Sequence, residues 1–168
     1  PITSPYTNTV NPQTIFVVAT NDVTGCSVST TATLLLRVNP IPSPTAPTDL
    51  EVCDTDNDGF ADFNLEERAL EIIAGELNTA VTYHDTQADA ETADNALVSP
   101  YTNIVMDQQT IYIRLTNTIT GCYNASETLT IRVLESPEVP VTIDDYVICD
   151  TNSDGISQFD LTTKDNEI

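Results

Sequence analysis

Alternating apolar and polar positions dominate much of the chain and predict β-strands, because successive side chains of a strand point to opposite faces. In the middle of the chain the expected strands cover 49–53, 80–84, 110–117 and 123–134. The last two enclose a turn at 118–121 and predict an antiparallel hairpin. The same hairpin pattern occurs near the start of the chain, over 14–20 and 27–38.

A segment with helical periodicity of its apolar residues lies between the first two of these strands. Apolar residues recur at helical spacing over 65–77, which predicts a helix of about three turns. Asn64 and Glu67 form a capping-box pair at its start. The Ala-rich segment 86–96 predicts a short surface helix with Thr86 as its N-cap.

The pattern is repeated. The strings Ser-Pro-Tyr-Thr-Asn, Gln-Thr-Ile-Phe/Tyr and Thr-Gly-Cys each occur twice, 95 or 96 residues apart. The chain therefore divides into the C-terminal half of one repeat (1–42), a complete repeat (43–138) and the N-terminal part of the next (139–168). Proline-rich borders predict short, semi-rigid connections. Short strands and a closing hairpin predict a mainly β fold of tandem immunoglobulin-like β-sandwich repeats with short helical insertions.

The amino-acid composition limits the classes of partner that this chain is expected to bind. The chain has 26 acidic and 5 basic residues and a net charge of −21. Nucleic acids and anionic membrane surfaces are therefore not expected as partners, because their phosphates require Lys and Arg. No run of about 18 apolar residues is present, so we expect no membrane insertion. An apolar content of 40% is enough to build a core.

An Asp-rich loop follows the first strand and occurs twice, from Cys53 to Leu65 and from Cys149 to Leu161. Oxygen ligands at alternate positions of a tight loop with a glycine at the turn are typical of Ca²⁺ sites. The first copy offers Asp54, Asp56, Asp58, the Phe60 carbonyl, Asp62 and Asn64. The second copy offers Asp150, Asn152, Asp154, the Ile156 carbonyl and Asp160.

The second half of each loop departs from the EF-hand pattern. Leu65 and Leu161 stand where a bidentate Glu belongs, and Asn64 and Asp160 fit helix N-caps equally well. We therefore expect a structural calcium site of modest affinity, about 10⁻⁴ to 10⁻³ M. The alternative is a solvated acidic turn held by Asx hydrogen bonds.

The four cysteines predict disulfides and an oxidising compartment. One pairing joins Cys53 to Cys122 within a repeat, and Cys26 and Cys149 then pair outside this chain segment. The other joins Cys26 to Cys53 and Cys122 to Cys149, between repeats. Spacing does not decide between them. We favour the first, because first and last strands are neighbours in such sandwiches and a long loop gains most from closure.

Catalytic residues are not evident. His84 is the sole histidine and stands beside Asp85, and adjacent strand residues point to opposite faces. We predict a surface histidine and no enzymatic activity. Tyr6 and Tyr101, which recur in the Pro-Tyr-Thr-Asn string, are predicted to be packing residues rather than sugar-binding platforms.

The combination of the Cys-Asp-rich string with Pro-Tyr-Thr-Asn, Gln-Thr-Ile-Phe/Tyr and Thr-Gly-Cys resembles the tandem repeats of very large secreted and cell-surface proteins of Bacteroidota. Many of these carry a type IX secretion sorting domain, and gliding adhesins are among the relatives. The resemblance implies an extracellular array of immunoglobulin-like repeats. Its partners would be the neighbouring repeats, with surface polysaccharide or the secretion machinery as further candidates.

These observations lead to two functional hypotheses. The first is a structural, calcium-stabilised repeat that forms the stalk or spacer of a large extracellular adhesin or secreted surface protein. The alternative is a module in the same array that itself binds polysaccharide or another surface.

Overall fold

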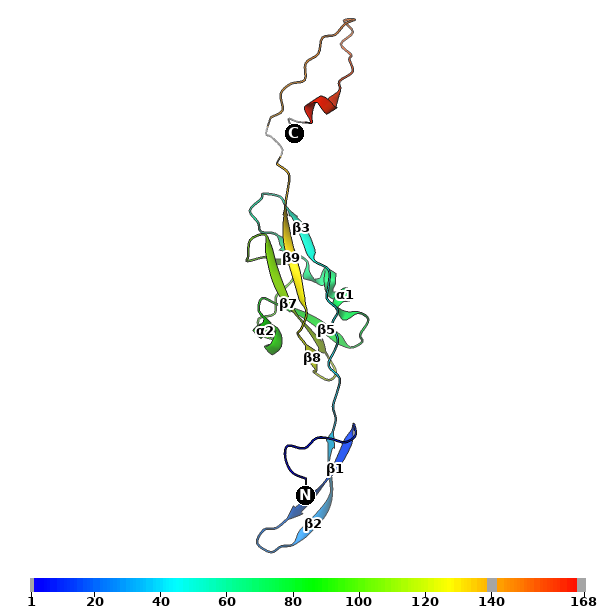
Figure 1. The fold of residues 1–168 in the computed structure, drawn as a ribbon, viewed down its shortest axis with the longest axis vertical. Helices are drawn as coiled ribbons and strands as arrows, with labels where there is room; N and C mark the ends of the chain where they lie inside the picture. Colours follow the sequence, from blue (N-terminus) through cyan, green and yellow to red (C-terminus); the bar gives the residue numbers. More distant parts are fainter. Residues whose placement is uncertain (1, 139–141, 166–168) are drawn as a thin grey trace.

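The computed structural model describes residues 2–138 and 142–165. The chain passes from an N-terminal hairpin through a central domain to a C-terminal segment along the long axis (Figure 1). The hairpin pairs β1 (Gln13–Thr20) with β2 (Ser27–Leu36) in an antiparallel sheet. It corresponds to the closing hairpin of the central domain, as the repeated sequence predicts.

One five-stranded sheet organises the central domain. Its strands are β3 (Leu50–Asp54), β5 (Thr79–His84), β7 (Gln108–Asn117), β8 (Tyr123–Asn124) and β9 (Thr128–Glu135). The order is β3-β9-β7-β5, and β8 pairs with the end of β7. β3 runs parallel to β9, whereas the other neighbours are antiparallel. The first and last long strands are therefore adjacent and point toward the same end of the domain.

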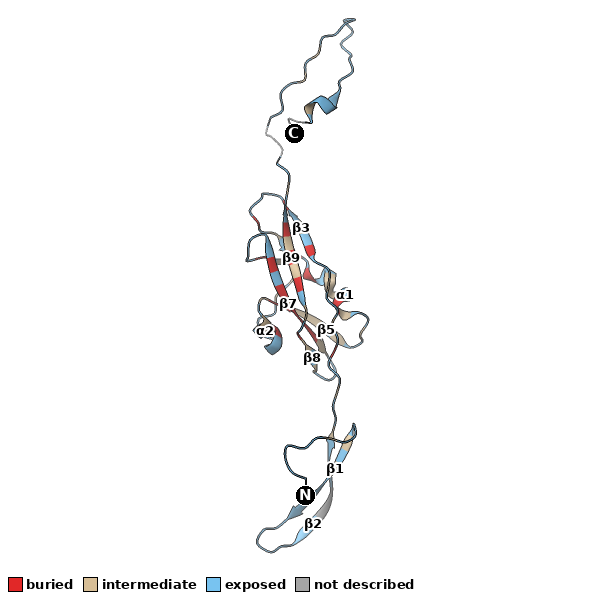
Figure 2. Cartoon of the chain, in the orientation of Figure 1, coloured by how far each residue is buried: buried red, intermediate tan, exposed pale blue. Residues whose placement is uncertain are grey.

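A second layer covers one face of this sheet. It contains the short pair β4 (Asp62–Phe63) and β6 (Tyr101–Thr102), followed in sequence after β4 by η1 (Leu65–Arg68) and α1 (Ala69–Ile73). Buried residues are concentrated in this domain (Figure 2). The core consists of Leu50, Phe63, Leu65, Ile72, Tyr83, Ile111, Ile113, Leu129, Ile131 and Val133. The prediction of a mainly β, sandwich-like fold is confirmed, with helix and a two-stranded sheet forming the second layer.

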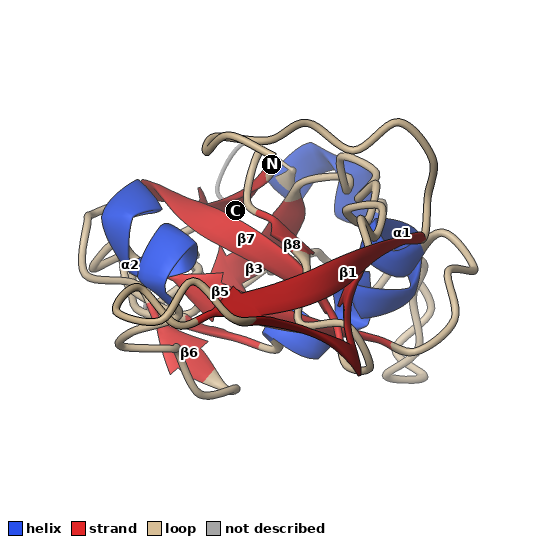
Figure 3. Ribbon diagram, turned by 90° about the horizontal axis from the view of Figure 1, so that it is seen from below, coloured by secondary structure: helices blue, strands red, loops and turns tan. Residues whose placement is uncertain are grey.

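The opposite face of the sheet carries α2 (Gln87–Thr92), so that the two α-helices lie on opposite sides of the strands (Figure 3). Thr86 caps α2 as predicted, accepting a hydrogen bond of 3.1 Å from the Asp89 N–H. Arg114, on the face of β7 opposite the core, donates to the carbonyls of Ala90 and Glu91 at 2.8 and 2.7 Å. This guanidinium supplies donors to carbonyls near the end of α2 and thereby holds the helix to the sheet.

The helix after the acidic loop differs from the sequence-based prediction. It ends at Ile73, and the next residue, Ala74, adopts a left-handed conformation with φ of 49°. Asn64 does not cap it, because the Asn64 side chain instead accepts a hydrogen bond from the Ser99 hydroxyl at 3.0 Å. A tertiary contact with the loop before β6 thus replaces the local capping box.

The predicted last strand, 123–134, is interrupted between β8 and β9.

His84 is fully buried, and the prediction of a surface histidine is wrong. Its Nε2 lies 2.9 Å from the Thr82 hydroxyl, and its Nδ1 lies 2.7 Å from the Asp94 carbonyl. The cause is α2, which covers this face of β5 and brings the turn after it over the imidazole ring. Both ring nitrogens are hydrogen-bonded, which gives the histidine a structural environment.

Much of the proline-rich connection is bound to the central domain. Asn124 Nδ2 donates to the Pro42 carbonyl at 3.1 Å, the Thr45 N–H donates to the Ile72 carbonyl at 3.0 Å, and the Thr48 N–H donates to Glu71 at 2.9 Å. On the other side, Asn11 exchanges two hydrogen bonds with the backbone of Val38, of 2.7 and 2.9 Å. The connecting segment between the two bodies is thus confined to 39–41.

The C-terminal segment contains η2 (Leu161–Lys164). The predicted boundary at 139 lies outside the described residues. Within the described parts of the chain, no helix has the length and apolar character needed to cross a membrane.

The core assignment can be tested with two substitutions on α1. Ile72 is fully buried, whereas Leu70 is 83% exposed. Ile72→Ala should lower the free energy of unfolding by about 2–4 kcal/mol, because it leaves a cavity between the layers. Leu70→Ala is the matched control and should change it by less than about 0.5 kcal/mol. Urea unfolding measures both, and equal losses would contradict the assignment.

Candidate functional site

The acidic loop between β3 and β4 is organised by a single carboxylate. Asp54 is buried, and its Oδ1 accepts hydrogen bonds from the N–H groups of Asp56 and Asn57 at 3.1 and 2.9 Å. Its Oδ2 accepts a bond of 2.7 Å from the N–H of Gly59. The Gly59 N–H, with smaller contributions from the other two, lowers the pKa of Asp54. Asp54 therefore serves first as the acceptor that closes the turn.

Two further carboxylates approach Asp54. One oxygen from each of Asp54, Asp56 and Asp58 lies within 4.8 Å of the other two. Hydrogen bonding with the Asp54 side chain, and then repulsion from Asp58, raises the pKa of Asp56. Asp56 and Asp58 are exposed. A hard cation with oxygen ligands would suit this arrangement, since it would offset the repulsion between the carboxylates.

The other predicted ligands of the first copy have different partners. Asp62 accepts a short hydrogen bond from the Thr102 hydroxyl, and Asn64 accepts one from Ser99. The backbone N–H of Phe60 donates to Asp58 at 2.8 Å, and the Phe60 side chain is exposed. The structure thus brings Asp54, Asp56 and Asp58 together, whereas the Asp62 and Asn64 side chains hold the layer containing β6.

The second copy adopts the same turn. Asp150 accepts hydrogen bonds from the N–H groups of Asn152, Ser153 and Gly155 at 3.0, 2.8 and 2.7 Å. The Gly155 N–H is the main cause of a lowered pKa of Asp150. The sequence of the loop is therefore sufficient to set its conformation, even though these residues of the second copy are exposed.

The remaining residues of the second copy complete the comparison. Asn152 Nδ2 donates to Asp154 at 2.8 Å, and Asp154 also accepts from the Ile156 N–H at 2.8 Å. Asp160 caps η2 by accepting from the Thr162 N–H at 3.2 Å. Helix capping by Asp160 is thus confirmed, in contrast to Asn64.

In the central domain a neighbouring loop clamps the acidic loop. The Gly59 carbonyl accepts from Asn103 Nδ2 at 2.8 Å and from the Asp107 N–H at 3.0 Å. The Oδ1 of the same Asn103 accepts from the Ala61 N–H at 2.8 Å. Gly59 itself has a φ of +81°. These contacts fix the loop at the end of the domain where β3 and β9 terminate.

A partly buried polar network supports the clamp. The Tyr101 hydroxyl donates to Asp85 at 2.7 Å and accepts from Gln109 Nε2 at 2.8 Å. Burial and the bond to Asp85 raise the pKa of Tyr101 to about 12. In the N-terminal hairpin unit, Tyr6 accepts from Gln13 at 2.7 Å in the same way. The packing role is confirmed for Tyr101, which lies against the hydrophobic core. Tyr6 is instead 38% exposed, so the prediction is wrong for this residue. A Gln that follows each Tyr in both copies is the sequence signal for this hydrogen bond.

The cysteines of the central domain lie at opposite ends. Cys53 stands opposite Leu134 near the end of β9, beside the acidic loop. The Cys122 carbonyl accepts from the Asn117 N–H at 2.8 Å, at the far end of β7. A strand rises about 3.3 Å per residue, so the ten residues of β7 separate these ends by roughly 30 Å. A disulfide requires Cα atoms within about 7 Å.

The predicted Cys53–Cys122 disulfide is therefore not formed in this fold, and none of the four cysteines is paired with another one of this chain. The expectation that the first and last strands are neighbours is correct. The disulfide prediction failed because of the relative direction of these two strands. Because β3 runs parallel to β9, Cys53 near the end of β3 is level with the end of β9 and not with the turn that precedes it.

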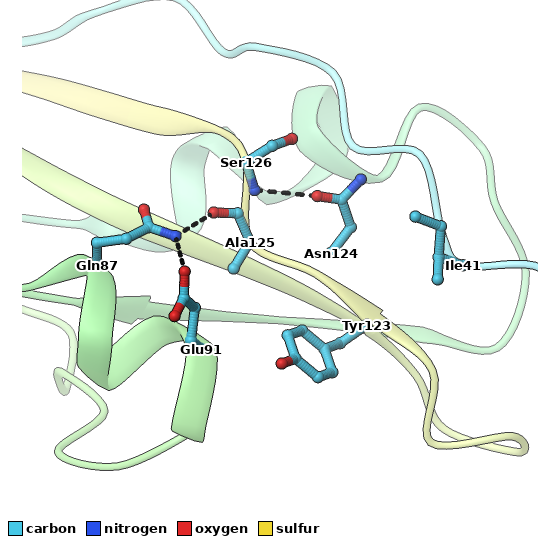
Figure 4. A pocket seen from close by; sticks show the side chains of 7 residues that line it. All are labelled: Ile41, Gln87, Glu91, Tyr123, Asn124, Ala125 and Ser126. Atoms are coloured by element: carbon cyan, nitrogen blue, oxygen red, sulfur yellow. Dashed lines mark hydrogen bonds between the residues drawn. The ribbon is translucent and has the colours of Figure 1, made fainter.

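The end of the domain that carries Cys122 also receives the incoming chain. A shallow cavity of about 430 Å³ lies there, lined by Ile41, Gln87, Glu91, Tyr123, Asn124, Ala125 and Ser126 (Figure 4). Gln87 Nε2 donates to the Ala125 carbonyl at 2.8 Å and to Glu91 at 3.2 Å. Ile41 belongs to the connecting segment, so this cavity is a place where the domain meets the chain that enters it.

Comparison with known families agrees with the placement of the two cysteines at opposite ends of the central domain. A model of the Flavobacterium inter-domain disulphide bond domain matches residues 49–137, more than half of the chain. The chain belongs to this family. The matched segment lies within the predicted complete repeat and includes both cysteines of the central domain. No curated protein matches the chain.

Membership of the inter-domain disulphide bond family supports the flavobacterial part of the resemblance and indicates a structural domain. The family description places the disulfide between domains. This accords with cysteines at opposite ends of a domain and accounts for the absence of a Cys53–Cys122 bond.

The clamp around the acidic loop predicts a large effect of Gly59→Ala. The added Cβ would clash with Met106 and lie 2.8 Å from Asp107 Oδ1. Gly75→Ala is the matched control, because Gly75 has a similar φ of +82° and nothing within 4 Å of the added Cβ. Both variants share the backbone strain, so Gly59→Ala should cost roughly 1–3 kcal/mol more. Denaturant unfolding measures the difference, and equal costs would show that the Met106 and Asp107 side chains move aside without loss.

Proposed function

We propose that this chain forms part of a non-enzymatic stalk or spacer in a large extracellular adhesin or secreted surface protein. The observation that carries the proposal is that the chain enters and leaves the domain at opposite ends, which gives the domain a direction. The chain enters at the end that bears Cys122, where Asn124 binds Pro42, and leaves at the end of β9, beside Cys53. Domains built in this way follow one another end to end and produce length.

The bound connection supports this role. Residues from Pro42 to Asp49 are fastened to the domain, in part by Arg68, which donates to the carbonyls of Thr48 and Asp49 at 3.1 and 3.0 Å. Few residues therefore remain free to bend between repeats. A semi-rigid array of domains is what a spacer requires, and the net charge of −21 keeps its exterior hydrated.

The resemblance to the repeats of Bacteroidota surface proteins supports a location of this stalk outside the cell, with type IX secretion as the proposed route. Disulfides between domains require an oxidising compartment, which agrees with that location. The neighbouring repeats are the partners that the proposal needs.

Calcium is the proposed stabiliser of the acidic loop. Asp54, Asp56 and Asp58 converge at the end of the domain that faces the next repeat. A bound cation would offset their repulsion and stiffen the exit end of each repeat. Asp54 and Asp150 already use their oxygens to close the turns, so the most available ligands of the first copy are Asp56 and Asp58.

The alternative, a polysaccharide- or surface-binding module, has less support. The tyrosine of the recurring Pro-Tyr-Thr-Asn string is occupied, because Tyr101 bonds to Asp85 and Gln109. Tyr123 is covered by the Arg114 guanidinium, which lies 3.4 Å from the ring centroid. The hydroxyl of Tyr101 and one face of the Tyr123 ring are thus already engaged, which makes both rings poorer platforms for stacking on a sugar.

The stalk proposal predicts how size grows with repeat number. Arrays of two and four complete repeats should increase in maximum dimension by a constant increment, on the order of 40 Å per repeat from the strand lengths. Small-angle X-ray scattering measures this. Side-by-side packing, in which length does not grow with repeat number, would contradict the proposal. Retention of the same arrays on surface polysaccharide would favour the alternative instead.

The calcium proposal predicts an increase in melting temperature. At 10 mM Ca²⁺ and an affinity of about 1 mM, the gain is about 1.4 kcal/mol, or roughly 5–10 °C for a domain of this size. Asp56→Asn should remove most of that gain, and it should raise the melting temperature in chelator because it relieves the repulsion around Asp56. Asp62→Asn is the matched control and should keep the calcium gain, since Asp62 bonds to Thr102.

Thermal unfolding of the 168-residue chain in calcium and in chelator measures these shifts. Identical melting curves in both conditions would show that the loop is an acidic turn without a metal.

A further inference from the structure

We propose that the first-strand cysteine of each repeat forms a disulfide with the hairpin-turn cysteine of the repeat that follows it. In this chain, Cys53 would pair with the turn cysteine of the next repeat, and Cys122 with the first-strand cysteine of the preceding one. That a disulfide joins two domains is part of the family description. The inference concerns which cysteine of each repeat takes part, and this connectivity differs from both pairings that the sequence suggested. It rests on the proposed end-to-end arrangement and specifies its covalent partner.

The first argument is the placement of the two cysteine types. Cys53 is exposed and lies at the end where β9 leaves the domain, while Cys122 is partly exposed at the end where the chain enters. The exit end of one repeat faces the entry end of the next. The two cysteine types therefore meet only across a junction, in the order first strand, then hairpin turn.

The second argument is the short distance across the junction. Val38 is held by Asn11 at the exit end of the N-terminal unit, and Pro42 is held by Asn124 at the entry end of the central domain. Four residues span at most about 14 Å. Asn124 is two residues from Cys122, so Cys122 lies near the exit end of the preceding repeat.

The repeated sequence shows where the partner of Cys122 stands. In the central domain, Cys53 is the ladder neighbour of Leu134. With Val38 aligned on Val133, the residue equivalent to Leu134 in the preceding unit is Asn39. A first-strand cysteine of that unit would lie about 4.8 Å from Asn39, the spacing of neighbouring strands. Asn39 is three residues from Pro42, which brings the two thiols to the same junction.

The third argument is that both cysteine types stand in or directly before turns that recur with the same hydrogen bonds. The Cys26 carbonyl accepts from the Asn21 N–H at 2.9 Å, as the Cys122 carbonyl does from Asn117 at 2.8 Å. Cys149 precedes the same Asp-closed turn as Cys53. The sulfur atoms are therefore carried by preorganised loops, which lowers the entropy lost on pairing.

The same geometry excludes pairing of Cys26 with Cys53. Cys26 occupies the turn of the N-terminal hairpin, which corresponds to the entry end of the preceding repeat. Cys53 lies at the exit end of the following one. Most of the length of two repeats separates them, far beyond the reach of a disulfide. The pair Cys122 and Cys149 is excluded for the same reason.

The chemistry is an ordinary thiol oxidation. Two thiols form one S–S bond, lose two protons, and pass two electrons to a thiol–disulfide oxidoreductase whose own disulfide becomes a dithiol. Each junction then has two covalent connections, the peptide segment 39–41 and the disulfide. Tension on the array would be carried through the strands β3 and β9 and not through the peptide connection alone.

Disulfide mapping of the native protein tests the connectivity. The protein is isolated under non-reducing conditions, free thiols are alkylated, and linked peptides are identified by mass spectrometry after proteolysis. The expected peptides join the Cys53 segment to a Thr-Gly-Cys segment of the following repeat, and the Cys122 segment to a Cys-Asp segment of the preceding repeat. A link between Cys53 and Cys122, a link between Cys26 and Cys53, or alkylation of all four cysteines would overturn the proposal.

Single substitutions in the native protein give an independent readout. Cys53→Ser should release one free thiol in the following repeat, and Cys122→Ser one in the preceding repeat, each detected by alkylation. If the bond were within the repeat, each substitution would instead release the thiol of the other cysteine of the central domain. Growth of length with repeat number is measured separately. An array that lengthens as expected but is linked differently would retain the stalk function and refute only this connectivity.

Discussion

The parallel pairing of β3 with β9 is the constraint on which the rest of the domain depends. It makes the first and last long strands point the same way, so the acidic loop, Cys53 and the departing chain share one end. The hairpin turn with Cys122 and the incoming Pro42 share the other. A domain with two chemically different ends has a direction, and a chain of such domains has one too. With an antiparallel pair in this position, Cys53 and Cys122 would lie at the same end.

The acidic loop shows how one carboxylate can serve two purposes. Asp54 satisfies three backbone donors in a turn that would otherwise expose them, which lowers its pKa and keeps it charged. Hydrogen bonding with this carboxylate, and then repulsion from Asp58, raises the pKa of Asp56. The turn is thus stable by itself and electrostatically strained at its rim. A cation at the rim would couple the loop to the surrounding ionic conditions without being needed to shape it.

Much of this domain could be predicted from local pattern. The strands, Thr86 as the N-cap of α2, Asp160 as the N-cap of η2 and the core positions Leu129, Ile131 and Val133 all depend on residues close in sequence. The failures share one origin. Asn64 bonds to Ser99, 35 positions away, and His84 is covered by the turn after α2. Competing tertiary contacts redirected both side chains.

The sequence by itself determined the repeat length, the β character, the turn conformations and the presence of two distinct cysteine types. These follow from hydrophobic period, from Asp and Gly at turn positions and from recurrence. Only the tertiary structure decided which end of the domain each cysteine occupies. Spacing along a chain measures contour length, whereas a disulfide depends on separation in space, and the direction of β3 against β9 sets that separation. The repeat could therefore be identified from the sequence, whereas the end of the domain at which each cysteine lies could not.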